Sequence, residues 1–364
     1  MPELTSGGVS LGDAPLSLLK RFLKSRLIFS LVVLLILVFQ NILTTPNFFE
    51  ITITNGLISG YIPNILDQAS TLVMVSLGMT LVTAAAGGQD ISVGSTMAIA
   101  ASFCGLLLNG PEYRTEVFHN PYVLALIAGL LGGALCGAFN GFLVSVLKIQ
   151  PMIASLILYT SGRSIAKVIT YGQTVYIMNP VFKYLGVQIP GIALRTTIIV
   201  TIVIVALVVL VLKLTSLGLY IESIGINSSA SRLVGLNSTV IKFMAFVICG
   251  VLAGAAGLVG SSSLGSVNAG ELGLGIEMDA ILAVALGGNM LGGGKFSIAG
   301  TVIGAYTIKS ITITLYAMNV RADQLNVFKA VIIVIIIVVS SDIFRSKVKE
   351  FARKIFAGKV RAEG

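Results

Sequence analysis

The stretch Thr196–Leu212, TTIIVTIVIVALVVLVL, runs its whole length without a charged residue. Roughly 17–25 mostly apolar residues are enough for a helix to cross a lipid bilayer, so this stretch can span a membrane. The whole chain has the same character, because its 364 residues are 55% hydrophobic and only 11% charged, whereas about a quarter of residues in soluble domains are charged. The apolar runs are continuous rather than alternating, which excludes a β-barrel. The sequence therefore predicts an all-α polytopic membrane protein.

Apolar segments of similar length recur along the chain and predict about ten transmembrane helices. The eighth segment is short enough to be a re-entrant or broken helix. All ten belong to one transmembrane domain over residues 27–343, with an N-terminal segment at 1–26 before it and a basic tail at 344–364 after it. The predicted spans are 27–43, 64–86, 91–108, 122–147, 152–170, 196–213, 241–262, 278–291, 297–317 and 325–342.

The positive charges predict the orientation of the chain. With the N-terminus inside, ten spans place both termini in the cytoplasm; 16 Lys and Arg residues then fall on the inner side and 4 on the outer side. Such an excess is typical of cytoplasmic loops. Basic residues precede a first span of full length, so the start of the chain is not a cleavable signal. The net charge of +9 is explained by topology and by contact with anionic lipid, and nucleic acid binding is not expected.

The stretch Leu286–Gly300, LGGNMLGGGKFSIAG, resembles a phosphate-binding loop at first sight. That loop needs a Gly, four residues, and then Gly-Lys-Ser/Thr, because backbone N–H groups and the lysine bind the phosphates while the hydroxyl binds Mg²⁺. Gly294 and Lys295 fit, but Asn289 stands where the first glycine should be and Phe296 where the hydroxyl should be. We therefore expect no nucleotide or other cofactor on this chain. The glycines instead predict a close-packed, flexible connection between two helices.

Two segments share one pattern of an apolar helix, a Gly-Gly-polar break, Ser and Gly, and a second apolar helix. They are TLVTAAAGGQDISVGSTMAIAA (Thr80–Ala101) and ILAVALGGNMLGGGKFSIAGTVIGA (Ile281–Ala305). Glycine-interrupted helices in corresponding positions of two halves often mark a transport path, although a chance match of glycine-rich sequence explains the pattern about equally well. The residues that we predict on the path or its gate are Gln89, Asp90, Ser92 and Asn289.

Asp90 is the strongest of these candidates because it stands beside two apolar spans. An ionisable group in such a place is costly unless it caps a helix, pairs with a charge or faces water. Two roles stay open. Asp90 lies on the solute route, or Asp90 or Ser92 caps the following helix by accepting a free backbone N–H.

The inner segment Leu217–Lys242 is long for a loop and mixes apolar, small and polar residues. Residues 228–236 predict a short helix, capped by Asn227 or Ser228 and ended by a glycine. Its apolar face has no core to cover, so it either docks a partner or lies on the membrane. The residues that we single out in this loop, which spans about 217–240 and is called the coupling segment below, are Asn227, Ala230, Arg232, Leu233, Val234 and Gly235.

Three motifs together resemble the permease subunits of bacterial ABC importers for ribose, galactose, xylose and related sugars. GMTLVTAAAGGQDISVGS (Gly78–Ser95) is similar to the family's Gly-Met-Thr…Gly-Ile-Asp-Leu-Ser-Val-Gly-Ser. LGLYIESIGINSSASRLVGLN (Leu217–Asn237) is similar to its inner loop, which carries Gly-Gly-Asn and Ala-x-x-x-Gly-Ile. DAILAVALGGNMLGGGKFSIAGTVIGA (Asp279–Ala305) is similar to its Asp-Ala-Ile-Ala-Ala-Val…Gly-Gly run. The match covers roughly residues 45–340 in order.

The resemblance implies a ten-helix permease of the bacterial inner membrane that works as a homodimer or heterodimer. It implies that residues 227–235 form the coupling helix for a separate ATPase, which would carry ATP and Mg²⁺. A periplasmic or lipid-anchored solute-binding protein would deliver a small polar solute, by family resemblance a sugar, to the outer side. This chain would then shape the path and catalyse nothing itself.

The chain departs from the family pattern at three places. Gln89 replaces the usual Ile, Ile226 replaces the second Gly before Asn227, and Ser228-Ser229 stands where an acid is common. The first change could alter the path, so the solute need not be a common pentose. The loop changes suggest a particular ATPase partner or one half of a heterodimer.

Two other functional classes compete with an ATP-driven importer. An ion-coupled secondary transporter would need a relay of acids inside the membrane, and outside Asp90 the predicted spans offer few. A membrane-embedded enzyme would need a metal cluster or a nucleophile with a base, and one His with three scattered Cys residues does not provide one.

Overall fold

The structure, a computed structural model, describes residues 27–44, 48–54, 56–110, 112, 114–321 and 323–340. It is mostly helical, and helices cover parts of all ten predicted spans. The long helices are α2 (Leu27–Thr44), α3 (Tyr61–Ala86), α4 (Val93–Asn109), α5 (Tyr122–Ser145), α6 (Pro151–Ile169), α8 (Thr196–Leu214), α11 (Ser238–Leu264), α13 (Ile298–Ala317) and α14 (Leu325–Ser340). The shorter ones are α7 (Pro180–Lys183), α9 (Leu217–Ile226), α10 (Ser228–Leu233) and α12 (Ile276–Leu286).

Short strands, which the sequence did not predict, connect some of the helices. β1 (Thr52–Thr54) and β2 (Leu57–Ser59) form an antiparallel hairpin before α3. β3 (Arg114–Thr115) runs parallel to β4 (Val175–Ile177), and β4 pairs antiparallel with β5 (Ser266–Val267). Because these three strands follow α4, α6 and α11, their small sheet holds the ends of those helices together.

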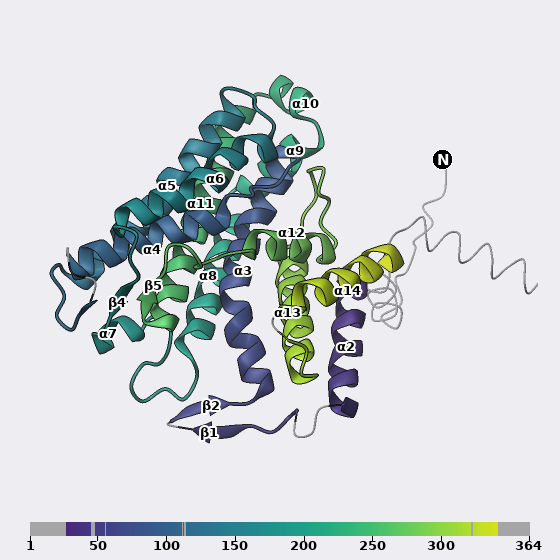
Figure 1. Cartoon of the computed structure of the whole chain (residues 1–364). Helices are drawn as coiled ribbons and strands as arrows, with labels where there is room; N and C mark the ends of the chain where they lie inside the picture. The colour runs from purple at the N-terminus through teal and green to yellow at the C-terminus, as the bar shows by residue number, and fades with distance from the viewer. Residues whose placement is uncertain are drawn as a thin grey trace, which may run out of the picture.

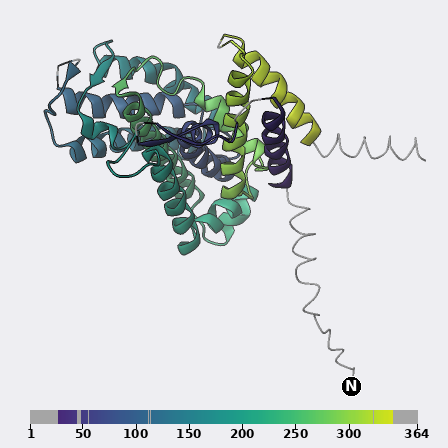
Figure 2. The same ribbon diagram turned by 90° about the horizontal axis from the view of Figure 1, so that it is seen from below.

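Helix α3 lies at the centre of the molecule, since 89% of the residues in its most apolar 18-residue stretch are buried. Figure 1 shows α4, α5, α6 and α11 on one side of α3, and α12, α13, α14 and α2 on the other side. The β1–β2 hairpin lies at one end of α3, whereas α9 and α10 lie at the opposite end (Figure 1). Seen from below, α2 and α14 again lie beside α13 (Figure 2).

Glycines allow α5 and α11 to pack with their backbones in contact, as the glycine-rich runs predict. A Cβ at Gly137 would overlap the carbonyl oxygen of Phe246, and a Cβ at Gly133 would overlap that of Gly250. Without side chains at these positions, the two helices approach more closely than ordinary residues allow. The close packing that the sequence predicted for these runs is thus confirmed.

The structure supports the polytopic helical prediction and leaves its details as predictions. Within the part of the chain that the structure describes, six helices are long and apolar enough to cross a membrane: α3, α5, α6, α8, α11 and α13. The predicted eighth span at 278–291 is too long, because α12 ends at Leu286 where the Gly287-Gly288 pair begins. The predicted segments 1–26 and 344–364 lie outside the described residues.

Candidate coupling and transport site

The two glycine breaks, which lie far apart in the sequence, meet in the structure. Gly87 ends α3 with φ 67°, a left-handed conformation that glycine adopts without steric cost. The Gly294 N–H donates to the carbonyl oxygen of Ala84 at 2.9 Å. The Gln89 side-chain amide donates to the carbonyl oxygen of Leu291 at 3.4 Å. The segment after α12 therefore packs directly against the end of α3, and its role as a close-packed connection is confirmed.

Asn289 fastens this second break to the helices around it, and it is only 8% exposed. Its Nδ2 donates to Thr301 Oγ1 at 2.9 Å and to the Val284 carbonyl oxygen at 3.1 Å. Its Oδ1 accepts the backbone N–H of Ser297 at 2.6 Å. Thr301 Oγ1 in turn lies 2.7 Å from Thr80 Oγ1 on α3. The side chain of Asn289 thus connects the two ends of the loop between α12 and α13, and through Thr301 it connects this loop to α3.

We expect Asn289→Ala to lower the thermal unfolding midpoint by at least about 3 °C, since buried groups left without a hydrogen-bond partner cost about 1–3 kcal/mol each. The midpoint would be measured on purified protein in detergent. Gln324→Ala, which removes an exposed amide before α14, should leave it unchanged. Equal midpoints for the two variants would contradict a fastening role for Asn289.

Asp90 is 2% exposed and is held by hydrogen bonds at the start of α4. Its Oδ1 accepts the backbone N–H of Ser92 at 2.9 Å and the Ser92 hydroxyl at 2.7 Å. The Asn140 amide on α5 donates to the same oxygen at 3.2 Å. The N-cap position of α4 is Ser92, whose side chain makes no capping hydrogen bond, and the N–H that Asp90 accepts belongs to this N-cap residue rather than to the first turn of the helix. The place of Asp90 on a solute route stays a prediction.

The coupling segment forms the short helix that the sequence predicted. Asn227 Oδ1 accepts the backbone N–H groups of Ser229 and Ala230 at 3.1 and 2.9 Å, so Asn227 is the N-cap of α10. Leu233 is 90% exposed and Val234 is 78% exposed. The helix ends at Leu233, two residues earlier than Gly235, which has φ 85°. Large apolar side chains this exposed at the tip of a protein are typical of a binding surface.

Helix α9 connects this tip to both glycine breaks. A Cβ at Gly225 would overlap the Ala84 carbonyl oxygen and the Gly294 backbone nitrogen. A Cβ at Gly293 would lie 3.1 Å from the carbonyl oxygen of Gly225 and 3.2 Å from the Cα of Gly87. Three backbone segments therefore touch at one point without intervening side chains. They are α9, the end of α3 and the loop between α12 and α13.

A buried charge cluster joins the last three helices, which sequence reasoning missed. Asp279 was expected only to stabilise the start of its helix, and it does lie in the first turn of α12. Its Oδ1 also accepts a 2.6 Å hydrogen bond from Lys329 Nζ on α14, and its Oδ2 lies 3.6 Å from Lys309 Nζ on α13. Both lysines fall inside predicted spans. A charged group inside a membrane span usually pairs with one of opposite charge, so their positions could have indicated an acidic partner.

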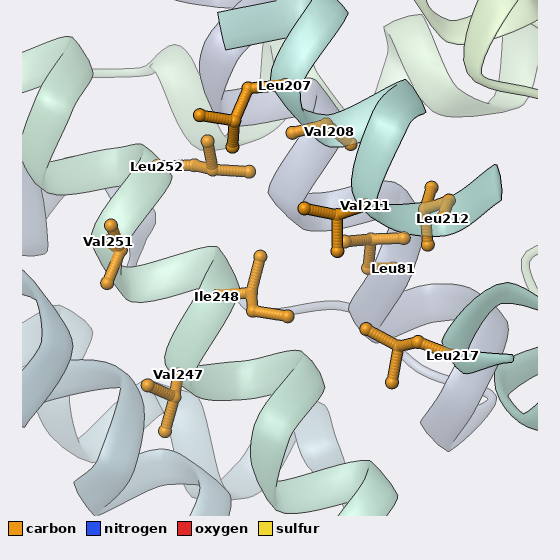
Figure 3. A pocket seen from close by; sticks show the side chains of 10 residues that line it. All are labelled: Leu81, Leu207, Val208, Val211, Leu212, Leu217, Val247, Ile248, Val251 and Leu252. Carbon is orange, nitrogen blue, oxygen red and sulfur yellow. The ribbon is translucent and has the colours of Figure 1, made fainter. Parts of the chain in front are cut away.

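An apolar cavity of about 220 Å³ lies between α3, α8, α9 and α11 (Figure 3). All of its lining side chains are aliphatic: Leu81, Leu207, Val208, Val211, Leu212, Leu217, Val247, Ile248, Val251 and Leu252. Binding of a polar solute requires a few placed polar groups, so this cavity is not a site for one. Among the described residues, no group of three or more His, Cys, Asp or Glu side chains is placed to hold a metal ion.

Comparisons with known proteins were made for the whole chain. Residues 61–340 match a family described as the permease component of the branched-chain amino acid transport system. The galactofuranose transporter permease protein YtfT of Escherichia coli (strain K12) is 35% identical over 88% of this chain and 91% of its own. The fructose import permease protein FruF of Bifidobacterium longum (strain NCC 2705) is 36% identical over 88% and 89%. The ribose import permease protein RbsC of Escherichia coli (strain K12) is 34% identical over 86% and 92%. No solved structure matches the chain.

The described residues form several long apolar helices, and the permease relatives show that the chain is a multi-pass membrane transport component rather than an enzyme. The particular family follows from the match to residues 61–340 and from relatives that cover most of both chains. The chain belongs to this family of transport permeases, and the predicted membership of the ABC importer permeases is confirmed. The ion-coupled alternative is not supported.

Proposed function

We propose that this chain forms the membrane path of an ATP-driven, binding-protein-dependent importer whose solute is a sugar or a similar small polar molecule. The family description names branched-chain amino acids, but three relatives that are 34–36% identical are named for galactofuranose, fructose and ribose. Identity at this level over nearly the whole length favours a sugar. Gln89 and Asn289, which supply amide groups near the meeting breaks, remain our candidates for the path, with Asp90 and Ser92 beside them.

The observation that carries this proposal is the exposed apolar tip joined to the glycine breaks by α9. A path that is opened by a separate ATPase subunit needs a surface on which the ATPase docks and a rigid contact between that surface and the gate. Helix α10 supplies the first and the contact at Gly225 supplies the second. ATP-driven closure of the motor would then bias the helices between two packing arrangements.

Further parts of the proposal concern partners and orientation. Ala230, Leu233 and Val234 dock on an ABC ATPase subunit, which binds ATP and Mg²⁺ in place of this chain. A second permease subunit completes the path, and a solute-binding protein docks at the end of α3 that carries the β1–β2 hairpin. Ten spans cross the bacterial cytoplasmic membrane, and both termini and α10 lie in the cytoplasm.

The test of this function is solute uptake by reconstituted vesicles. With ATPase, binding protein and internal ATP present, we expect labelled sugar to accumulate, and omission of any one of them should reduce uptake to background. The permease alone should bind the sugar undetectably in calorimetry. Accumulation by the permease alone, driven by a proton or sodium gradient, would refute the proposal.

A further inference from the structure

A second cavity, of about 360 Å³, lies where the end of α5, the start of α6, α10 and the start of α11 come together. Its volume falls in the range of roughly 300–1,000 Å³ that is usual for sites of small ligands. Unlike the cavity in Figure 3, it is lined by several charged and hydroxyl-bearing side chains. We call it the basic cleft, and neither the coupling role of α10 nor the glycine breaks account for it.

The basic cleft carries positive charge that nothing in its lining neutralises. Lys148, Arg232 and Lys242 line it, and no Asp or Glu does. None of the three belongs to an ion pair among the described residues. Lys242 is half-buried and is repelled by the charge of Arg232. Lys148 and Arg232 are exposed, so the attraction of these like charges for an anion acts largely through water and is weakened by salt.

Neutral donors in the basic cleft point to the same kind of ligand. Ser145 is 6% exposed, and its hydroxyl has no hydrogen-bond partner in the described part of the chain, whereas buried hydroxyls nearly always have one. Gln150, the N-cap residue of α6, and Pro151, its first residue, also line the cleft, and no side chain caps this helix. Free N–H groups and the helix dipole make such an N-terminus attractive to anions. Thr239 adds a further hydroxyl.

We propose that the basic cleft binds a phosphate group, carried by a lipid headgroup or by a soluble phosphate. Phosphate fits this donor set because its several oxygens can accept from three cations, a hydroxyl and a helix N-terminus together. A headgroup source requires the cleft to face the anionic inner leaflet, and to that extent the inference rests on the orientation given under Proposed function. Basic pockets between membrane helices on the cytoplasmic side are common sites for such headgroups.

A bound phosphate would connect three parts of the coupling machinery. Lys148 comes from the α5–α6 loop, where it has φ 59°, a conformation uncommon for a residue other than glycine. Arg232 comes from α10, where its Nε also donates to Ser238 Oγ at 2.7 Å, and Lys242 comes from α11. The ligand would hold α10 against the membrane domain, so its occupancy would set how freely the coupling helix moves.

The experiment measures the thermal unfolding midpoint of the full-length permease in phosphatidylcholine nanodiscs. One arm adds increasing fractions of phosphatidylglycerol to the lipid, and a second arm titrates inorganic phosphate. We expect a saturable rise of the midpoint in at least one arm. The double variant Lys148→Gln/Lys242→Gln should bind the phosphate group about thirtyfold more weakly, so that a correspondingly higher concentration is needed for half of the rise in the midpoint. The factor follows from about fivefold in affinity for each lysine near an anionic lipid surface. Lys213→Gln removes an exposed cation at the end of α8, outside the cleft, and should change nothing.

The two arms identify the source of the phosphate. A response to phosphatidylglycerol alone assigns a lipid headgroup, and a response to inorganic phosphate assigns a soluble ligand. The proposal is overturned if neither arm responds or if Lys213→Gln weakens the response as much as the double substitution does. No ATPase is present in either arm, so failure of the importer function would appear in the uptake assay instead.

Discussion

Leu233→Glu should abolish capture of the partner ATPase by the permease. Leu233 is 90% exposed at the end of α10, and the loss of a hot-spot side chain from an interface weakens binding at least about thirtyfold. A glutamate carboxylate would also be buried in the interface without a residue of opposite charge, which adds a desolvation cost to the free energy of binding. The measurement is co-purification of the ATPase with a tagged permease from detergent extracts.

The permease itself should fold normally, because the substituted side chain contacts solvent. Size-exclusion elution and yield of Leu233→Glu should therefore equal those of wild type. Lys213→Gln makes the same change in net charge at an exposed position outside α10, and it should retain the ATPase. Leu233→Met, which keeps an apolar side chain of similar volume, should retain it as well. Normal ATPase recovery with Leu233→Glu would refute the docking role of α10.

Gly225→Ala should leave ATPase binding intact and lower ATP-driven uptake at least tenfold. A Cβ at Gly225 would overlap the Ala84 carbonyl oxygen and the Gly294 nitrogen. Both atoms belong to backbone, which moves less easily than a side chain, so α9 must shift away from the breaks. The exposed face of α10 is unchanged, and the motor still docks. What is lost is the rigid contact that passes its movement to α3 and α12.

The matched control for Gly225→Ala is Gly292→Ala in the loop that faces it. A Cβ at Gly292 would meet no atom within 4 Å, and this glycine does not have a positive φ. Gly292→Ala should therefore show wild-type uptake and wild-type stimulation of ATP hydrolysis by loaded binding protein. Normal uptake by Gly225→Ala, measured alongside, would show that the α9 contact does not carry the coupling.

The long helices and α10 could be predicted from the sequence because each one leaves a local signal, whereas α7 and α9 were not predicted. Continuous apolar runs gave the long helices, and Asn227 followed by small residues gave the cap of α10. The end of α12 at Leu286 was placed wrongly because the apolar pattern continues to Leu291 while the Gly287-Gly288 pair stops the helix. The short strands could not be predicted, since a strand of two or three residues has too few positions to show a period.

The contacts within the candidate site were harder to predict, because they join residues that are distant in the sequence. The two breaks were recognised as similar, but nothing local shows that Gly294 donates to Ala84. Asn140 resembles any small polar residue in a glycine-rich helix, and only the fold places its amide beside Asp90. Gly225 was likewise hidden, since its importance lies in the atoms that surround it.

The carboxylate of Asp279, with Lys309 and Lys329 against it, has a consequence for biosynthesis of the chain. A lysine within a membrane-inserted segment costs about 2.5–3.5 kcal/mol at the bilayer centre. As the ribosome delivers the chain from its N-terminus, α12 emerges before α13 and α14, so the acid precedes both bases. Each ammonium group entering the lipid thus finds its counter-charge already there. A chain shortened before residue 298 would contain the acid alone and would be a natural substrate for quality-control proteases.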